Sequence, residues 1–138
     1  MLLFLKLFII ALTVFLVFDI IWLVFVAKNF YKNQIGFLMK EKINYLSAII
    51  FYLIFIVSLV IFVIMPNIDE NLVKLILKAS LFGLVTYATY DLTNFSTLKG
   101  FKINVVLVDL SYGVIIANIT AILTYLIYRG IFNWLEKF

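Results

Sequence analysis

Four long apolar stretches dominate this chain and leave it few ways to fold. They cover about residues 4–27, 43–65, 74–95 and 103–128. About 20 apolar residues are enough to cross a lipid bilayer as a helix. Lipid offers no partner to backbone N–H and C=O groups, so each stretch must pair its own backbone as a helix. We therefore predict an all-α fold, a polytopic integral membrane bundle of four antiparallel transmembrane helices, in one transmembrane domain over residues 1–138.

The composition agrees with lipid as the solvent of this chain. Hydrophobic residues make up 67% of it, against about 45–50% in soluble domains. Cysteine and histidine are absent, which excludes disulfides, thiolate nucleophiles and imidazole acid–base chemistry. We predict no bound metal and no cofactor. The net charge of +4 reflects lysines that flank the apolar stretches, so we expect membrane lipids rather than nucleic acid as partners.

The segment between the first two stretches, residues 28–42, mixes lysines with apolar residues. Tyr31, Ile35 and Leu38 recur there at helical spacing. This pattern predicts a short amphipathic helix that lies on the membrane surface and is interrupted near Gly36; a tight basic loop is the alternative. Tyr31 is expected to anchor in the membrane interface, where aromatic side chains are common.

Acidic residues inside the apolar stretches are the first sign of a site. There are three of them: Asp19, Asp91 and Asp109. Each costs about 2.5–3.5 kcal/mol at the centre of a membrane helix. They stand nine, eight and seven residues from the lysines at the nearest span ends, Lys28, Lys99 and Lys102. At a rise of 1.5 Å per residue, all three carboxyl groups are predicted to lie roughly 10–14 Å below one membrane face.

The stretch "YATYDLTNFSTLKG", residues 87–100, surrounds the second of these carboxyl groups with hydroxyl and amide groups. At helical spacing these polar residues fall on two adjoining faces, at the depth of Asp91. They can hydrogen-bond carboxyl groups that water does not reach. Trp22 and Tyr112 stand one helical turn after the other two aspartates. The candidate binding site is therefore the set Asp19, Trp22, Tyr87, Tyr90, Asp91, Thr93, Asn94, Asp109 and Tyr112, with Lys99 and Lys102 at its rim.

The same stretch resembles the signature of a bacterial family of small four-helix membrane proteins, grouped as a domain of unknown function. The shared elements are "YDLTN" followed by "TLKG", "DIIWLVFVAKNFYKNQIGFL" at residues 19–38 and "VDLSYG" at residues 108–113. The chain departs from the family pattern at Phe101, where the family more often has tryptophan. The resemblance implies a multi-pass protein of the inner membrane and draws attention to the three aspartates. It implies no activity.

Acidic residues from three helices at one depth favour a functional site over isolated polar contacts. The leading hypothesis is a membrane-embedded, aspartate-lined polar site that binds a cation, an amine or a lipid head group. The runner-up is proton- or cation-coupled transport. A homodimer would then supply the acidic groups that one copy lacks in the other half of the membrane.

Two further hypotheses follow from the same residues. A lipid-modifying enzyme could use the carboxyl groups as acid and base. No nucleophile or nucleotide-binding motif accompanies them in the sequence, so whether the chain is an enzyme stays open. A structural accessory subunit would use the aspartates only to hold helices together through hydrogen bonds.

Overall fold

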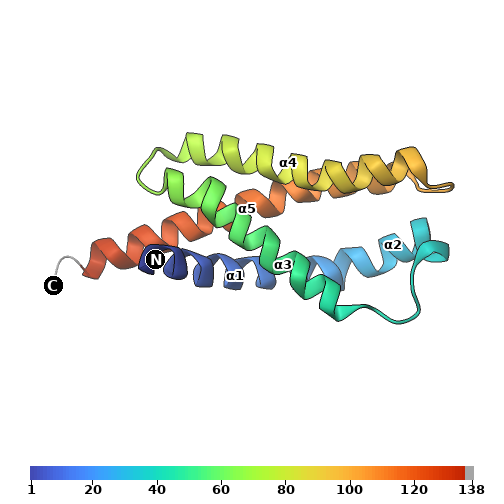
Figure 1. Ribbon diagram of the computed structural model, residues 1–138, viewed down its shortest axis with the longest axis horizontal. Coiled ribbons are helices and arrows are strands. Elements are labelled where there is room, and N and C mark those ends of the chain that lie inside the picture. The colour runs from blue at the N-terminus through green and yellow to red at the C-terminus, as the bar shows by residue number, and fades with distance from the viewer. Residues whose placement is uncertain (136–138) are drawn as a thin grey trace.

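The chain forms a bundle of long helices. The computed structural model describes residues 1–135, so the last three residues of the predicted domain lie outside it. The described part contains no strand. Four of its helices are long and apolar enough to cross a membrane, Leu2–Leu38, Tyr45–Asn67, Leu72–Thr97 and Ile103–Phe132, and consecutive helices run in opposite directions (Figure 1). The predicted all-α membrane fold is confirmed.

Two of the four long helices contain a π turn, in which the backbone hydrogen bonds reach one residue further than in an α-helix. The first helix consists of α1 (Leu2–Trp22), the π turn η1 (Leu23–Ala27), α2 (Lys28–Ile35) and the 3-10 turn η2 (Gly36–Leu38). The second consists of α3 (Tyr45–Leu59), the π turn η3 (Val60–Ile64) and the 3-10 turn η4 (Met65–Asn67). The remaining two are α4 (Leu72–Thr97) and α5 (Ile103–Leu135).

Side-chain caps and a glycine turn set several helix ends. The Asn44 side chain accepts a hydrogen bond from the Ser47 N–H at 3.2 Å, at the start of α3. Asn71 accepts one from the Lys74 N–H at 2.9 Å, at the start of α4. Asparagine is a preferred residue at this capping position. Between α4 and α5, Gly100 has a φ of 80°, which glycine adopts at little cost, and α5 returns beside α4.

Helices α4 and α5 approach each other most closely where two glycines meet. A Cβ atom added to Gly83 would lie 2.2 Å from the carbonyl oxygen of Gly113 and 2.9 Å from the Cβ of Ala117. A Cβ atom added to Gly113 would lie 2.5 Å from the ring of Tyr87. No side chain larger than hydrogen fits at this crossing, so the glycines allow the backbones to touch.

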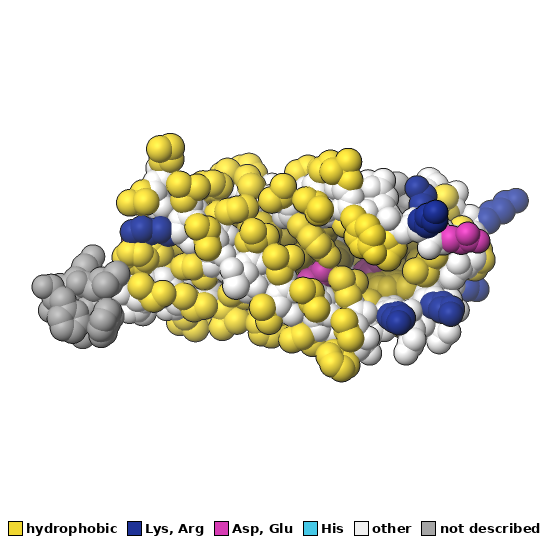
Figure 2. Space-filling model, turned by 90° about the horizontal axis from the view of Figure 1, so that it is seen from below, with side chains coloured by type: hydrophobic (Ala, Val, Ile, Leu, Met, Phe, Trp, Pro, Cys, Tyr) yellow, Lys and Arg dark blue, Asp and Glu magenta, His cyan; other side chains and the backbone are white. Residues whose placement is uncertain are grey.

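The apolar core runs between all four long helices. It includes Leu7 and Phe15 of α1, Ile56 and Leu59 of α3, and Ile116 of α5, each of which is essentially inaccessible. Many other large apolar side chains remain exposed. They cover the middle of the molecule, whereas lysine and arginine side chains gather toward its ends (Figure 2). This distribution is the one expected of a protein whose middle faces hydrocarbon.

The predicted separate helix on the membrane surface is wrong. Helix α2 continues α1 through the π turn without a break. Its apolar side chains, those of Phe30, Tyr31 and Ile35, pack against Phe101, just before α5, and against Val105 and Val106 of α5. Protein therefore covers part of their surface, and α2 packs against α5 instead of lying apart as a separate surface helix. The predicted interruption is confirmed, because α2 ends at Ile35 and a 3-10 turn begins at Gly36.

Candidate functional site

Asp19 of α1 is held by two tyrosines from other helices. The hydroxyl of Tyr52 on α3 donates to its Oδ2 at 2.5 Å, and the hydroxyl of Tyr112 on α5 donates to its Oδ1 at 2.7 Å. The aspartate is only 6% exposed. Each carboxyl oxygen therefore has one hydroxyl donor, and the contact joins three helices through neutral partners.

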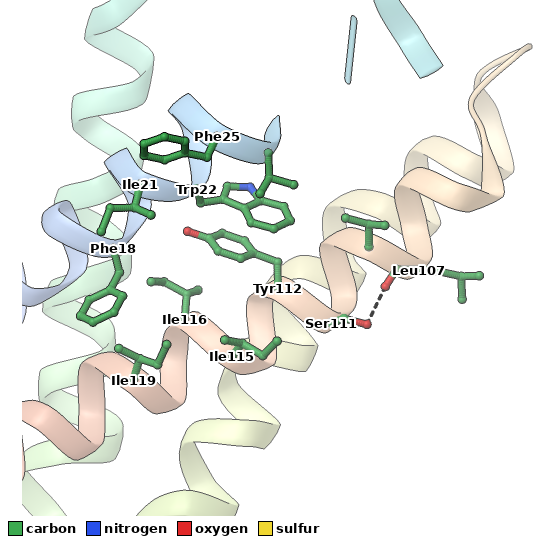
Figure 3. Close-up of a pocket in the computed structure, with 12 residues that line it drawn as sticks. Phe18, Ile21, Trp22, Phe25, Leu107, Ser111, Tyr112, Ile115, Ile116 and Ile119 are labelled. Carbon is green, nitrogen blue, oxygen red and sulfur yellow. Dashed lines mark hydrogen bonds between the residues drawn. The ribbon is translucent and has the colours of Figure 1, made fainter. Parts of the chain in front are cut away.

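Asp109 of α5 has a tyrosine donor of its own. The hydroxyl of Tyr31 on α2 donates to its Oδ1. The indole of Trp22 lies near the Tyr31 hydroxyl. Trp22 also stacks on Tyr112, with 4.1 Å between ring centroids and 13° between planes (Figure 3). Trp22 thus links the group around Asp109 to the group around Asp19.

Asp91 of α4 differs from the other two aspartates. Its side chain is completely buried, at 0% exposure. Within the described residues, neither of its carboxyl oxygens has a hydrogen-bond donor. Its polar neighbour is the carboxyl group of Asp109, which it can hydrogen-bond when one of the two carries a proton. Among the described residues, Asp91 is therefore a buried carboxyl group without a hydroxyl, amide or basic donor, and its ionised form is costly unless something else pairs with it.

A cavity of about 370 Å³ adjoins these two carboxyl groups. Its lining residues come from α3, α4 and α5 and are Phe51, Thr86, Tyr87, Tyr90, Asp91 and Asp109. The cavity is open at one side. Acidic side chains are visible at the bottom of a hollow in the hydrophobic surface of the molecule (Figure 2). We define the carboxyl cavity as the space lined by these six residues.

The structure brings most of the predicted site residues together, in two groups. Tyr87, Tyr90, Asp91 and Asp109 line the carboxyl cavity, and Asn94 lies near Tyr90, one helical turn further along α4. Asp19, Trp22 and Tyr112 form the adjoining group. Among the described residues, no three acidic side chains lie close enough together to hold one metal ion. The three predicted carboxyl groups are thus a pair and a separate aspartate.

The predicted hydroxyl donors of α4 do not serve the carboxyl groups. Thr93 donates to the carbonyl oxygen of Thr89 at 2.6 Å and is exposed. Thr86, Thr89, Thr97 and Ser111 likewise donate to carbonyl oxygens of their own helices. A threonine or serine inside a helix reaches the preceding turn more easily than a neighbouring helix. Tyrosine, with its longer side chain, supplies the hydroxyl donors that reach Asp19 and Asp109 from other helices.

The predicted rim lysines, Lys99 and Lys102, are exposed and form no ion pair with the aspartates. Within residues 1–135 the one ion pair joins Lys74 to Glu70 at 2.7 Å, next to the loop before α4. There the hydrogen bond and the charge of Lys74 hold the pKa of Glu70 below its usual value. The buried carboxyl groups therefore have no basic partner among the described side chains.

Sequence reasoning missed Tyr31, Tyr52 and Phe51 as site residues. Tyr52 lies ten residues after Lys42, so the depth count that located the aspartates places it about 15 Å below the same face. That signal was available in the sequence. Tyr31 had no comparable signal, because its position depends on α2 continuing α1 and packing on α5.

A larger groove lies on another side of Trp22, but it is apolar. It has a volume of about 520 Å³ and runs between α5 and the part of the first long helix where α1 ends and η1 begins. Phe18, Ile21, Ile115 and Ile119 line it, beside the Trp22 and Tyr112 rings (Figure 3). The hydroxyl of Ser111 is occupied by the carbonyl oxygen of Leu107 at 2.8 Å. Size alone therefore does not mark the polar site.

The fold and these buried polar groups define a class: a multi-pass helical membrane protein with carboxyl groups between its spans. The chain belongs to the family described as "Predicted membrane protein (DUF2177)", whose model matches residues 4–126. The resemblance seen in the sequence motifs is thereby confirmed. No curated protein matches the chain, and no solved structure matches it.

Proposed function

We propose that the protein binds an organic cation, an amine or a quaternary ammonium group, in the carboxyl cavity. The observation that carries this proposal is Asp91, which is fully buried and lacks a donor within the described chain. An aspartate that served only to join helices would be bonded to another helix, as Asp19 is to Tyr52 and Tyr112. A cationic ligand supplies the charge and the donors that Asp91 lacks.

The lining of the cavity favours an organic cation over a metal ion. Three of its six residues, Phe51, Tyr87 and Tyr90, are aromatic. Aromatic faces attract ammonium groups and are a common element of sites for quaternary amines. Calcium, by contrast, takes about six to eight oxygen ligands. The cavity offers two carboxyl groups and only a few hydroxyls. One of these hydroxyls, that of Thr86, is already bonded to its own helix.

Binding of small amines tests this proposal. The protein is placed in nanodiscs of phosphatidylglycerol, a lipid without an amine, and titrated with n-butylamine and tetramethylammonium in a calorimeter. We expect Asp91→Asn to weaken binding about tenfold or more, because a hydrogen bond to a charged group contributes about 1.5–3 kcal/mol. Asp69→Asn, an exposed aspartate outside the spans, is the matched control and should bind like the wild type. Equal binding by both variants would refute the proposal.

Proton-coupled transport is the second candidate, and the tyrosine contacts favour it. Tyr31 joins Asp109, and Tyr52 and Tyr112 join Asp19, so each group holds a hydroxyl that can pass a proton to a carboxyl group. Intramembrane carboxyl groups form such relays in pumps and transporters. Reconstituted vesicles with an internal pH dye test it: flux driven by an amine gradient should require Asp91. Binding without flux would leave the binding function alone.

We also infer that the membrane is the inner membrane of a bacterium. Helical spans support this location, because the spanning proteins of outer membranes are typically β-barrels. Separating the two membranes of cells that express a tagged protein, followed by immunoblotting, tests the inference. Recovery in the outer-membrane fraction would contradict it.

A further inference from the structure

The carboxyl cavity opens sideways toward lipid. Its walls come from α3 at Phe51, from α4 at Tyr87 and Tyr90, and from α5. Helix α3 crosses the molecule obliquely and diverges from α4 toward its N-terminal end (Figure 1). Phe51 is 44% exposed and Tyr90 is 63% exposed, both within membrane spans. A ligand that enters between them comes from the hydrocarbon layer.

A second groove lies further along α4, between α4 and the second long helix. It has a volume of about 350 Å³ and is lined by Phe62, Val63, Lys78, Leu81, Phe82, Val85 and Thr86. The two spaces share Thr86. Below them, buried Phe55 contacts Phe82 of the second groove at 5.4 Å and Tyr87 of the carboxyl cavity at 6.3 Å between ring centroids. The two spaces therefore adjoin at Thr86, with residues of both packed on Phe55, and we call the second one the tail groove.

The carboxyl cavity and the tail groove together have the length of a long hydrocarbon chain. From Asp91 to Lys78 the path follows 13 residues of α4, or about 20 Å. This exceeds half of the roughly 30 Å hydrocarbon core. Five of the seven residues that line the tail groove are apolar, and the Thr86 hydroxyl is occupied by the carbonyl oxygen of Phe82 at 2.8 Å. A chain lying there stays in mostly apolar surroundings until it reaches Lys78.

We propose that the occupant is a long-chain cationic amine, with its amino group at Asp91 and Asp109 and its hydrocarbon chain in the tail groove. This rests on the proposed function and adds the class of ligand and its route from the membrane. None of the described residues that line the carboxyl cavity is basic. The phosphate of a zwitterionic head group would find no partner there. The site therefore fits an amine without a phosphate, and phosphatidylethanolamine should not compete.

Photolabelling locates the chain directly. The wild-type protein in phosphatidylglycerol nanodiscs is labelled with hexadecylamine that carries a diazirine at its far end, and labelled peptides are mapped by mass spectrometry. Hexadecanol with the same diazirine is the matched control, since it differs only in the charged group. We expect the amine to label residues 78–85 and 62–63 about tenfold more than the alcohol does, and Asp91→Asn to remove the excess. Added phosphatidylethanolamine should leave the labelling unchanged.

Val85→Trp separates this inference from the proposed function. Val85 faces lipid at 54% exposure, so a larger side chain can fill the tail groove without entering the core. We expect the variant to lose the labelling excess while it binds n-butylamine like the wild type. If labelling by the amine matches that by the alcohol while n-butylamine still binds through Asp91, the long-chain ligand is refuted and the amine site stands. If n-butylamine does not bind either, both proposals fail.

Discussion

Substituting Gly83 by alanine tests whether the crossing of α4 and α5 depends on direct backbone contact. The new Cβ would lie 2.2 Å from the Gly113 carbonyl oxygen, 2.7 Å from its carbon and 2.9 Å from the Cβ of Ala117. Ordinary contact begins at 3.4 Å, so the helices must separate by about 1 Å. The obstructing atoms are mostly backbone and cannot rotate away. We expect overpacking to lower the free energy of unfolding by about 1–3 kcal/mol. The better helix propensity of alanine should offset up to about 1 kcal/mol of this loss.

The matched control is Gly130→Ala, on α5. No described atom lies within 4 Å of a Cβ added there, so only the gain in helix propensity remains and the variant should unfold at or above the wild-type temperature. Thermal unfolding of the purified proteins in one detergent gives the comparison. Gly83→Ala should also weaken amine binding, because the same crossing sets the spacing of Asp91 and Asp109. A Gly83→Ala protein as stable as Gly130→Ala would show that the helices do not need to touch.

Two further predictions concern the hydrogen bonds of the carboxyl groups and use the same unfolding assay. Asp19→Leu should lower the free energy of unfolding by about 1–3 kcal/mol, because it leaves the Tyr52 and Tyr112 hydroxyls without an acceptor. Asp91→Leu should leave it nearly unchanged, since it removes a group without a described donor. The reverse order would contradict these assignments. Tyr31→Phe should lower the free energy of unfolding by about 0.5–1.5 kcal/mol, because it removes the donor to Asp109. The control Tyr45→Phe changes an exposed tyrosine and should cause no measurable loss. Equal losses in the two variants would argue against the Tyr31 contact.

The spans could be predicted from sequence because lipid permits only a few backbone structures. Predicted starts at residues 43 and 103 lie within two residues of the observed Tyr45 and Ile103. The depth of an aspartate also follows from counting residues, and all three are buried. These properties depend on the local chain alone.

The pairing of the carboxyl groups could not be predicted in the same way. Depth does not fix the rotation of a helix about its axis, so Asp19, Asp91 and Asp109 at one depth could have formed one cluster or a pair and a single residue. The rotation follows from contacts far apart in sequence, such as Gly83 with Gly113 and Tyr31 with Asp109. The role of Tyr31 depends on Phe101, Val105 and Val106, about 70 residues further along the chain.

The π turn at Leu23–Ala27 lets the first long helix hold one extra residue between Trp22 and Tyr31 without turning Tyr31 away from the site. Each residue of a helix advances the chain by about 100° around the axis, and a π turn adds one residue to one turn. Deleting one residue there would restore a regular α-helix and leave Tyr31 facing Trp22 and Asp109, because the π turn holds the extra residue within one turn. A relative that is one residue shorter between these positions could therefore keep a tyrosine donor for Asp109, whereas a deletion outside the π turn would rotate Tyr31 by about 100°.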